Sequence, residues 1–170
     1  MNRCCIFRST RGFTLIELVV VLVIMSTILA ISGPRLARFA RSAKLEAAAN
    51  RLQVLLLFAK EQALWQKSGT RVVVLDGWRG VEVWERDTTA EEERYVSIPQ
   101  TGAKNRFPDG ISLVQIRLNG ATIPDGQGVE LEVNPLISKD MVEFFLKGAE
   151  GELYRVWISA GGGLVGCESV

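Results

Sequence analysis

One apolar segment near the N-terminus constrains this chain more than any other feature. Residues 13–33 carry no charge except Glu17. As a helix, this segment would span about 31 Å at roughly 1.5 Å per residue, which matches the hydrocarbon core of a bilayer. The sequence therefore predicts a transmembrane helix with one acidic residue near its start.

Glu17 is expected to serve a function because a charge in a bilayer is costly. Even lenient insertion scales assign about 2.5 to 3.5 kcal/mol to a charge at the centre of a membrane helix. The alternative is that Glu17 lies close enough to the lipid headgroups to remain solvated.

The first twelve residues resemble the charged start of an export signal, with Arg3, Arg8 and Arg11 ahead of the apolar segment. Ordinary signal peptides have an apolar region of about 7 to 15 residues followed by a small-residue cleavage site, and this segment is longer. We therefore expect it to be retained. Basic residues flank both of its ends, so the positive-inside rule does not orient it.

A second helical pattern follows Gly33 and Pro34, where a helix is expected to stop or bend. Residues 35–66 contain no Gly or Pro, so we predict one kinked helix of about 54 residues. Its expected buried face repeats at spacings of three and four: Leu45, Ala48, Leu52, Leu55 and Ala59. A separate basic stripe consists of Arg35, Arg38, Arg41 and Lys44. This stripe is expected to face solvent or lipid headgroups, or to pair with acidic groups of a neighbouring subunit.

The remaining sequence has the pattern of an antiparallel β domain. Short strands are predicted at residues 71–75, 81–85, 95–98, 111–118, 129–133, 142–146, 153–158 and 164–167, with Gly, Pro, Asp and Asn between them. The fold class is therefore α+β, with a long helix packed on a two-sheet β-sandwich. Four segments are predicted: a leader at 1–12, a transmembrane helix at 13–33, an amphipathic helix at 34–67 and a β domain at 68–170.

The composition offers little support for catalysis or cofactor binding. The chain has no histidine, no Cys/His spacing typical of a metal site, and no group near Cys167 in sequence that would activate it. Residues 161–166 match G-x-G-x-x-G, but the chain has no room for the helix and acidic residue that a dinucleotide site needs. We expect no enzyme, no metal and no cofactor. Residues 70–170 have a net charge of −6, which makes DNA an unlikely partner.

The N-terminal pattern resembles that of type IV pilins and type II secretion pseudopilins. It combines a short basic leader, the Gly12-Phe13 junction, Glu17 and an uninterrupted apolar run, followed by Pro34 at the position where these proteins commonly bend. The resemblance implies that prepilin peptidase cuts between Gly12 and Phe13, removing Cys4 and Cys5, and that the new Phe13 amine is methylated. It also implies a single-pass inner-membrane protein with a periplasmic C-terminal domain. Glu17 would pair with the Phe13 amine of an adjacent subunit.

The whole length most resembles the GspH/FimT group of minor pseudopilins. This resemblance rests on residues 57–63, 76–78, 142–145 and 155–159. It implies a minor pseudopilin at or near the tip of a type II secretion pseudopilus, with other pseudopilin subunits as partners, and secretion cargo or the outer-membrane secretin as further candidates. Two alternatives stay open. One is a FimT-like minor pilin involved in DNA uptake, and the other is a membrane-anchored β domain unrelated to filaments.

Overall fold

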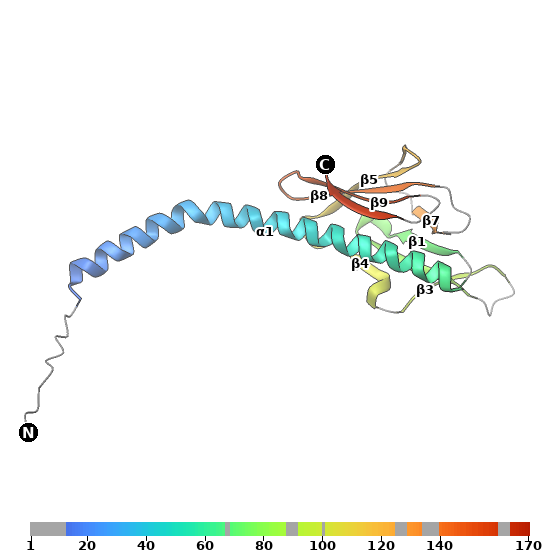
Figure 1. Ribbon diagram of the computed structural model, residues 1–170, viewed down its shortest axis with the longest axis horizontal. Coiled ribbons are helices and arrows are strands. Elements are labelled where there is room, and N and C mark those ends of the chain that lie inside the picture. The colour runs from blue at the N-terminus through green and yellow to red at the C-terminus, as the bar shows by residue number, and fades with distance from the viewer. Residues whose placement is uncertain are drawn as a thin grey trace, which may run out of the picture. The chain divides into compact units, whose positions relative to one another are not determined.

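A computed structural model describes residues 13–66, 69–87, 92–99, 101–124, 129–133, 140–159 and 164–170. Its contacts divide the chain into two compact units, the first unit (Met1–Phe39) and the distal unit (Ala40–Val170). Each unit is considered by itself. Among the described residues, one α-helix precedes ten β-strands (Figure 1). The fold is α+β, as predicted.

Helix α1 (Leu15–Gln66) is continuous through Gly33 and Pro34 and contains 52 residues. Its length agrees with the predicted helix of about 54 residues. The expected stop at the proline does not occur, because the backbone remains helical there. The side chains at positions 33–35 lie outside the description, so the proposed bend at Pro34 stays a prediction.

The second part of α1 buries the face that the sequence predicted. The side chains of Leu45, Ala48, Leu52, Leu55 and Ala59 are all at most 3% exposed. Ala49, Leu56 and Ala63 widen this apolar face. The many alanines keep one side of the helix shallow, so that strands of the distal unit can pack close to it. The amphipathic spacing thus determines which face docks.

Sheet A is antiparallel and has the strand order β3-β2-β1-β7, with β4 also beside β2. Its strands are β1 (Thr70–Val74), β2 (Gly80–Arg86), β3 (Tyr95–Ser97), β4 (Lys104–Arg106) and β7 (Val129–Val133). Burial alternates along β7 and β1, as expected for strands with one face on a core. The buried Thr70 hydroxyl donates to the Ala59 carbonyl of α1 at 2.8 Å, which ties this sheet to the helix.

Sheet B is also antiparallel, with the order β10-β9-β8-β5-β6. Its strands are β5 (Ser112–Leu118), β6 (Ala121–Ile123), β8 (Val142–Lys147), β9 (Leu153–Ile158) and β10 (Val165–Ser169). The chain leaves sheet B after β6, adds β7 to sheet A, and returns with β8. This exchange of strands between the sheets makes the distal unit one domain.

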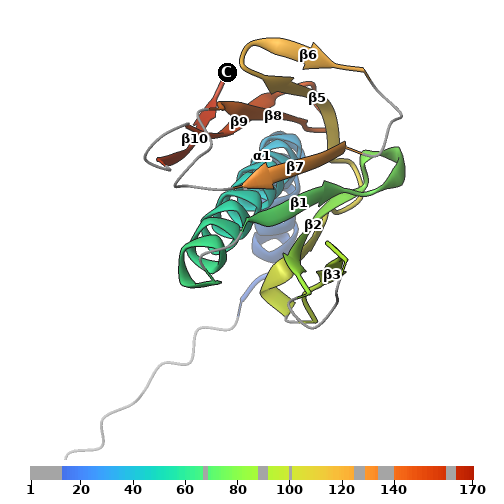
Figure 2. The same cartoon turned by 90° about the vertical axis from the view of Figure 1, so that its right-hand side faces the viewer.

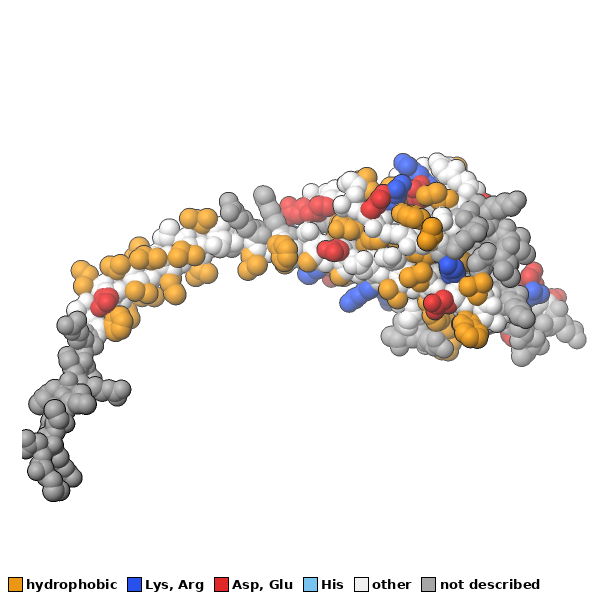
Figure 3. Space-filling model, viewed as in Figure 1, with side chains coloured by type: hydrophobic (Ala, Val, Ile, Leu, Met, Phe, Trp, Pro, Cys, Tyr) orange, Lys and Arg blue, Asp and Glu red, His pale blue; other side chains and the backbone are white. Residues whose placement is uncertain are grey.

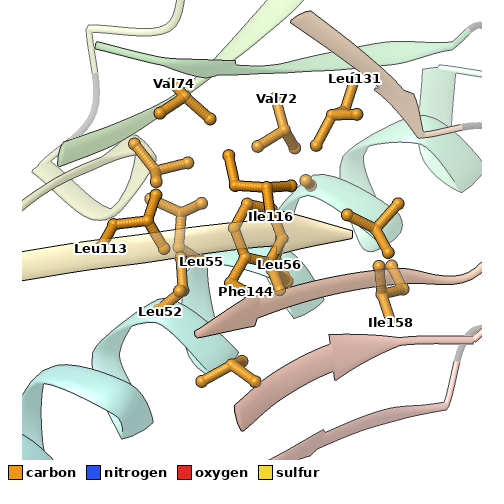
Figure 4. Packing of buried hydrophobic residues seen from close by; sticks show 14 of the residues in the cluster. Leu52, Leu55, Leu56, Val72, Val74, Leu113, Ile116, Leu131, Phe144 and Ile158 are labelled. Carbon is orange, nitrogen blue, oxygen red and sulfur yellow. The ribbon is translucent and has the colours of Figure 1, made fainter. Parts of the chain in front are cut away.

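Both sheets and the second part of α1 share a single hydrophobic core. Figure 2 shows the second part of α1 lying beside β8 and β9 of sheet B and beside β1 and β7 of sheet A. Figure 4 shows Leu52, Leu55 and Leu56 of α1 facing Val72 and Leu131 of sheet A and Phe144 and Ile158 of sheet B. Phe144 is fully buried and lies centrally among them.

Each of the eight predicted strands overlaps an observed one, and two observed strands were missed. Strands β4 and β6 have three residues each. Strand β3 is equally short, but residues 95–98 include one aromatic and two β-branched side chains that indicate a strand. Asp76-Gly77 forms the predicted turn within the 3-10 helix η1 (Asp76–Trp78), where Gly77 has a φ of 68°. A second 3-10 helix, η2 (Thr101–Ala103), leads into β4. The glycine turn expected at residues 161–163 lies outside the described residues.

The shared core predicts a clear contrast between two leucines of α1. Leu52→Ala removes a side chain that is 0% exposed, so it should lower the free energy of unfolding by about 2–5 kcal/mol. Leu57→Ala, at a side chain that is 37% exposed, should cost less than about 1 kcal/mol. Denaturant titrations of the full chain in detergent, followed by tryptophan fluorescence, measure both values. Equal costs would contradict the packing described.

Candidate functional site

The start of α1 is organised by Thr14. The helix begins at Leu15, and the Glu17 amide donates to the Thr14 hydroxyl oxygen at 3.3 Å. The Leu18 amide donates to the Thr14 carbonyl, also at 3.3 Å. Thr14 is therefore the N-cap residue, and Thr14 to Glu17 has the spacing of a capping box. Sequence reasoning missed this role, although the Thr-x-x-Glu pattern was there to indicate it.

Glu17 lies in the first turn of α1 and is exposed. Its carboxylate forms no ion pair with a described residue. The positive end of the helix dipole favours an acid at this position, by about 0.3–1 kcal/mol at exposed sites. That gain is smaller than the cost of a charge in lipid. The local structure thus leaves Glu17 available to a partner that the described part of this chain does not supply.

The part of the helix that carries Glu17 is not buried by any described residue of its own unit. The stretch Leu15–Ser32 is long and apolar enough to cross a membrane, and none of it is buried. Figure 3 shows hydrophobic side chains covering this part of the helix. The Ser26 and Thr27 hydroxyls donate to the carbonyls of Leu22 and Val23 at 2.7 and 2.8 Å, so both are satisfied inside the helix. In this stretch Glu17 is the one charged residue, and its carboxylate has no ion-pair partner among the described residues.

Of the other predicted site residues, Phe13 is described in full, Pro34 by its backbone alone, and Gly12 not at all. Phe13 directly precedes Thr14 and is 79% exposed. Gly12 lies outside the described residues, and so does the side chain of Pro34, although its backbone is helical. The geometry thus brings Phe13 and Glu17 to the same helix end, one turn apart.

The basic stripe is partly paired within the chain. Arg41 forms an ion pair with Glu150, which lies beyond β8 in the turn before β9. Lys44 is exposed, and the side chains of Arg35 and Arg38 lie outside the description. Arg41 thus has an acidic partner in its own chain, and not in a neighbouring subunit as one of the two sequence-based interpretations expected.

Sheet B carries a cluster of three charged side chains in which one arginine pairs with two glutamates. Arg155 donates to the Glu143 carboxylate at 2.9 Å and also pairs with Glu168. Glu143 is only 7% exposed, and Arg155 provides its ion-pair partner at this buried position. These contacts join the neighbouring strands β8, β9 and β10. The arrangement is suited to stabilising the sheet.

The chemistry of Cys167 on β10 is suppressed by its surroundings. Partial burial, followed by the carboxylates of Glu46 and Glu168, raises the pKa of its thiol. A raised pKa lowers the fraction of reactive thiolate at neutral pH. Within the described ranges, no group of three or more His, Cys, Asp and Glu side chains could hold a metal ion.

Comparison with known proteins bears on the same end of the chain. Residues 7–33 match the family model described as the prokaryotic N-terminal methylation motif. No curated protein and no solved structure matches the chain. The match covers the second half of the leader, the Gly12-Phe13 junction, Glu17 and the apolar segment up to residue 33.

This motif implies processing by prepilin peptidase and assembly with other pilin subunits. Together with the exposed apolar helix, it indicates a membrane-anchored protein. The chain therefore carries a prepilin-type signal similar to that of type IV pilin-like proteins.

Proposed function

We propose that this protein is a minor pseudopilin of a type II secretion system. The observation that carries the proposal is the exposed, unpaired Glu17 carboxylate in a membrane-length helix, directly behind a prepilin-type junction. A charge that costs free energy in lipid has a physical reason to exist if assembly supplies its counter-ion.

Assembly would complete the site in two steps. Cleavage between Gly12 and Phe13 creates a new amine at Phe13, which stays positively charged after methylation. In a helical stack of subunits, this amine and the Glu17 carboxylate of an adjacent subunit would neutralise each other. Thr14 supports the pairing because it caps the helix and holds the first turn in place.

The distal unit would supply the contacts that differ between subunits. We place it in the periplasm, anchored to the inner membrane by a single span, at or near the tip of the pseudopilus. Its partners would be other pseudopilin subunits, with secretion cargo or the outer-membrane secretin as further candidates. The role is structural and not enzymatic. The assignment as a minor pseudopilin is supported by the resemblance to the GspH/FimT group. It is also supported by the net charge of −6 over residues 70–170, which disfavours the alternative of DNA uptake.

Processing can be tested directly at the protein terminus. Protein extracted from membranes of a host with an active prepilin peptidase should begin with N-methylated Phe13, as measured by mass spectrometry of the N-terminal peptide. A Gly12→Val variant should keep Met1 and the whole leader, because a branched side chain would obstruct the peptidase. A wild-type protein that still begins at Met1 would contradict the proposed cleavage.

A deletion strain separates secretion from DNA uptake. Loss of the gene should abolish release of folded enzymes into the medium and leave DNA uptake unchanged. Wild-type protein should restore secretion, whereas Glu17→Ala should restore less than about a tenth of it, because the Phe13 amine loses its counter-ion in lipid.

Thr27→Ala provides the matched control, since its hydroxyl bonds only within the helix. It should restore secretion fully, with all three proteins present in membranes at equal amounts. Normal secretion with failed DNA uptake would instead assign the protein to a type IV pilus.

A further inference from the structure

A groove lies between α1 and strand β4 in the distal unit, with a volume of about 490 Å³. From α1 it is lined by Arg51, Val54 and Leu55. From the strand it is lined by Lys104, Asn105 and Arg106. It thus combines an apolar helix wall with a basic strand.

The charge of the groove is opposite to that of the domain around it. Arg51 and Arg106 form no ion pair with a described residue, and Lys104 Nζ lies 3.6 Å from Glu82 Oε1. The described lining contains no Asp or Glu. A local positive patch beside residues 70–170, whose net charge is −6, favours a short acidic segment over a long polyanion such as duplex DNA, which the surrounding carboxylates would repel.

Asn105 adds a polar group that lacks a partner. The residue is only 7% exposed, and its side-chain Nδ2 has no hydrogen-bond partner within the described part of the chain. A buried amide left unsatisfied destabilises the free protein. An oxygen acceptor from a ligand in the groove would satisfy this donor.

Strand β4 also presents a free edge. It pairs with β2 through Gly80, Val81 and Glu82 and has no second strand neighbour among the described residues. The Phe107 amide donates to the Arg79 carbonyl at 3.0 Å. Because hydrogen-bonded pairs alternate along an antiparallel ladder, the main-chain groups of Lys104 and Arg106 face away from β2. Such groups can bind an added extended segment.

We propose that this groove binds an extended acidic segment of a partner polypeptide, which lies along the free edge of β4. Its carboxylates would pair with Arg51 and Arg106, and its apolar side chains would lie on Val54, which is 64% exposed. A polypeptide accounts for the strand edge and the apolar wall together. A phosphate backbone accounts only for the charge. The inference goes beyond the proposed function and concerns the distal unit in either type of filament.

A defined probe tests the groove in the full-length protein in detergent micelles. The probe is a fluorescein-labelled eight-residue peptide of alternating Glu and Val, and its binding is measured by fluorescence anisotropy. It should bind saturably, while a peptide of alternating Lys and Val should not. Arg51→Glu and Arg106→Glu should each weaken binding by about tenfold or more. Lys44→Glu makes the same charge change on the same helix outside the groove and should alter binding by less than about twofold.

Two further measurements distinguish binding from a structural effect. Asn105→Leu should raise the melting temperature of the free protein, because it removes an unsatisfied buried amide, and should weaken peptide binding. Hydrogen exchange in the complex should slow at the Lys104 and Arg106 amides and stay unchanged at Asn105, which already faces β2.

The outcomes that overturn the proposal are equally specific. Failure of the Glu-Val peptide to bind saturably would overturn it, and so would an equal loss of binding in Lys44→Glu. Tighter binding of a short duplex DNA that depends on Arg51 and Arg106 would assign the groove to nucleic acid instead.

Discussion

The cost of placing the Glu17 carboxylate in a membrane-length apolar helix governs the first unit of this protein. Thr14 caps the helix, and the Ser26 and Thr27 hydroxyls donate to carbonyls one turn earlier, so these three polar side chains have partners within the segment. The carboxylate has none among the described residues. The segment therefore forms its own helical hydrogen bonds but lacks a counter-ion for the charge that it would place in lipid. This is the state expected of a subunit before assembly.

The distal unit depends on a different interaction, the burial of one face of α1 by two sheets at once. Leu52, Leu55 and Leu56 contact a core to which both sheets contribute, and β7 belongs to sheet A although it lies between two strands of sheet B in the sequence. The same helix therefore has two environments. Its first part is exposed and suited to lipid, while its second part carries the core of a β domain.

Sequence reasoning was most successful where a pattern repeats over many residues. The helical spacing identified the buried positions of α1, and alternation with turn residues located eight strands. It failed for β4 and β6, which have three residues each and fewer aromatic or β-branched side chains than residues 95–98. It also did not indicate which residue of the basic stripe is paired within the chain. Arg41 pairs with Glu150, more than a hundred residues away, and no local pattern indicates such a contact. The α1–β4 groove was missed for the same reason.

The sequence by itself determined the membrane segment, the prepilin-type junction, the α+β class and the face by which α1 docks, because each follows from local composition or periodicity. Only the tertiary structure decided which strands share a sheet, which charges meet, and where an unsatisfied Asn105 lies beside unpaired arginines. Those features join residues that are distant in the chain. Their energies depend on distance and burial, and these exist only once the chain is folded.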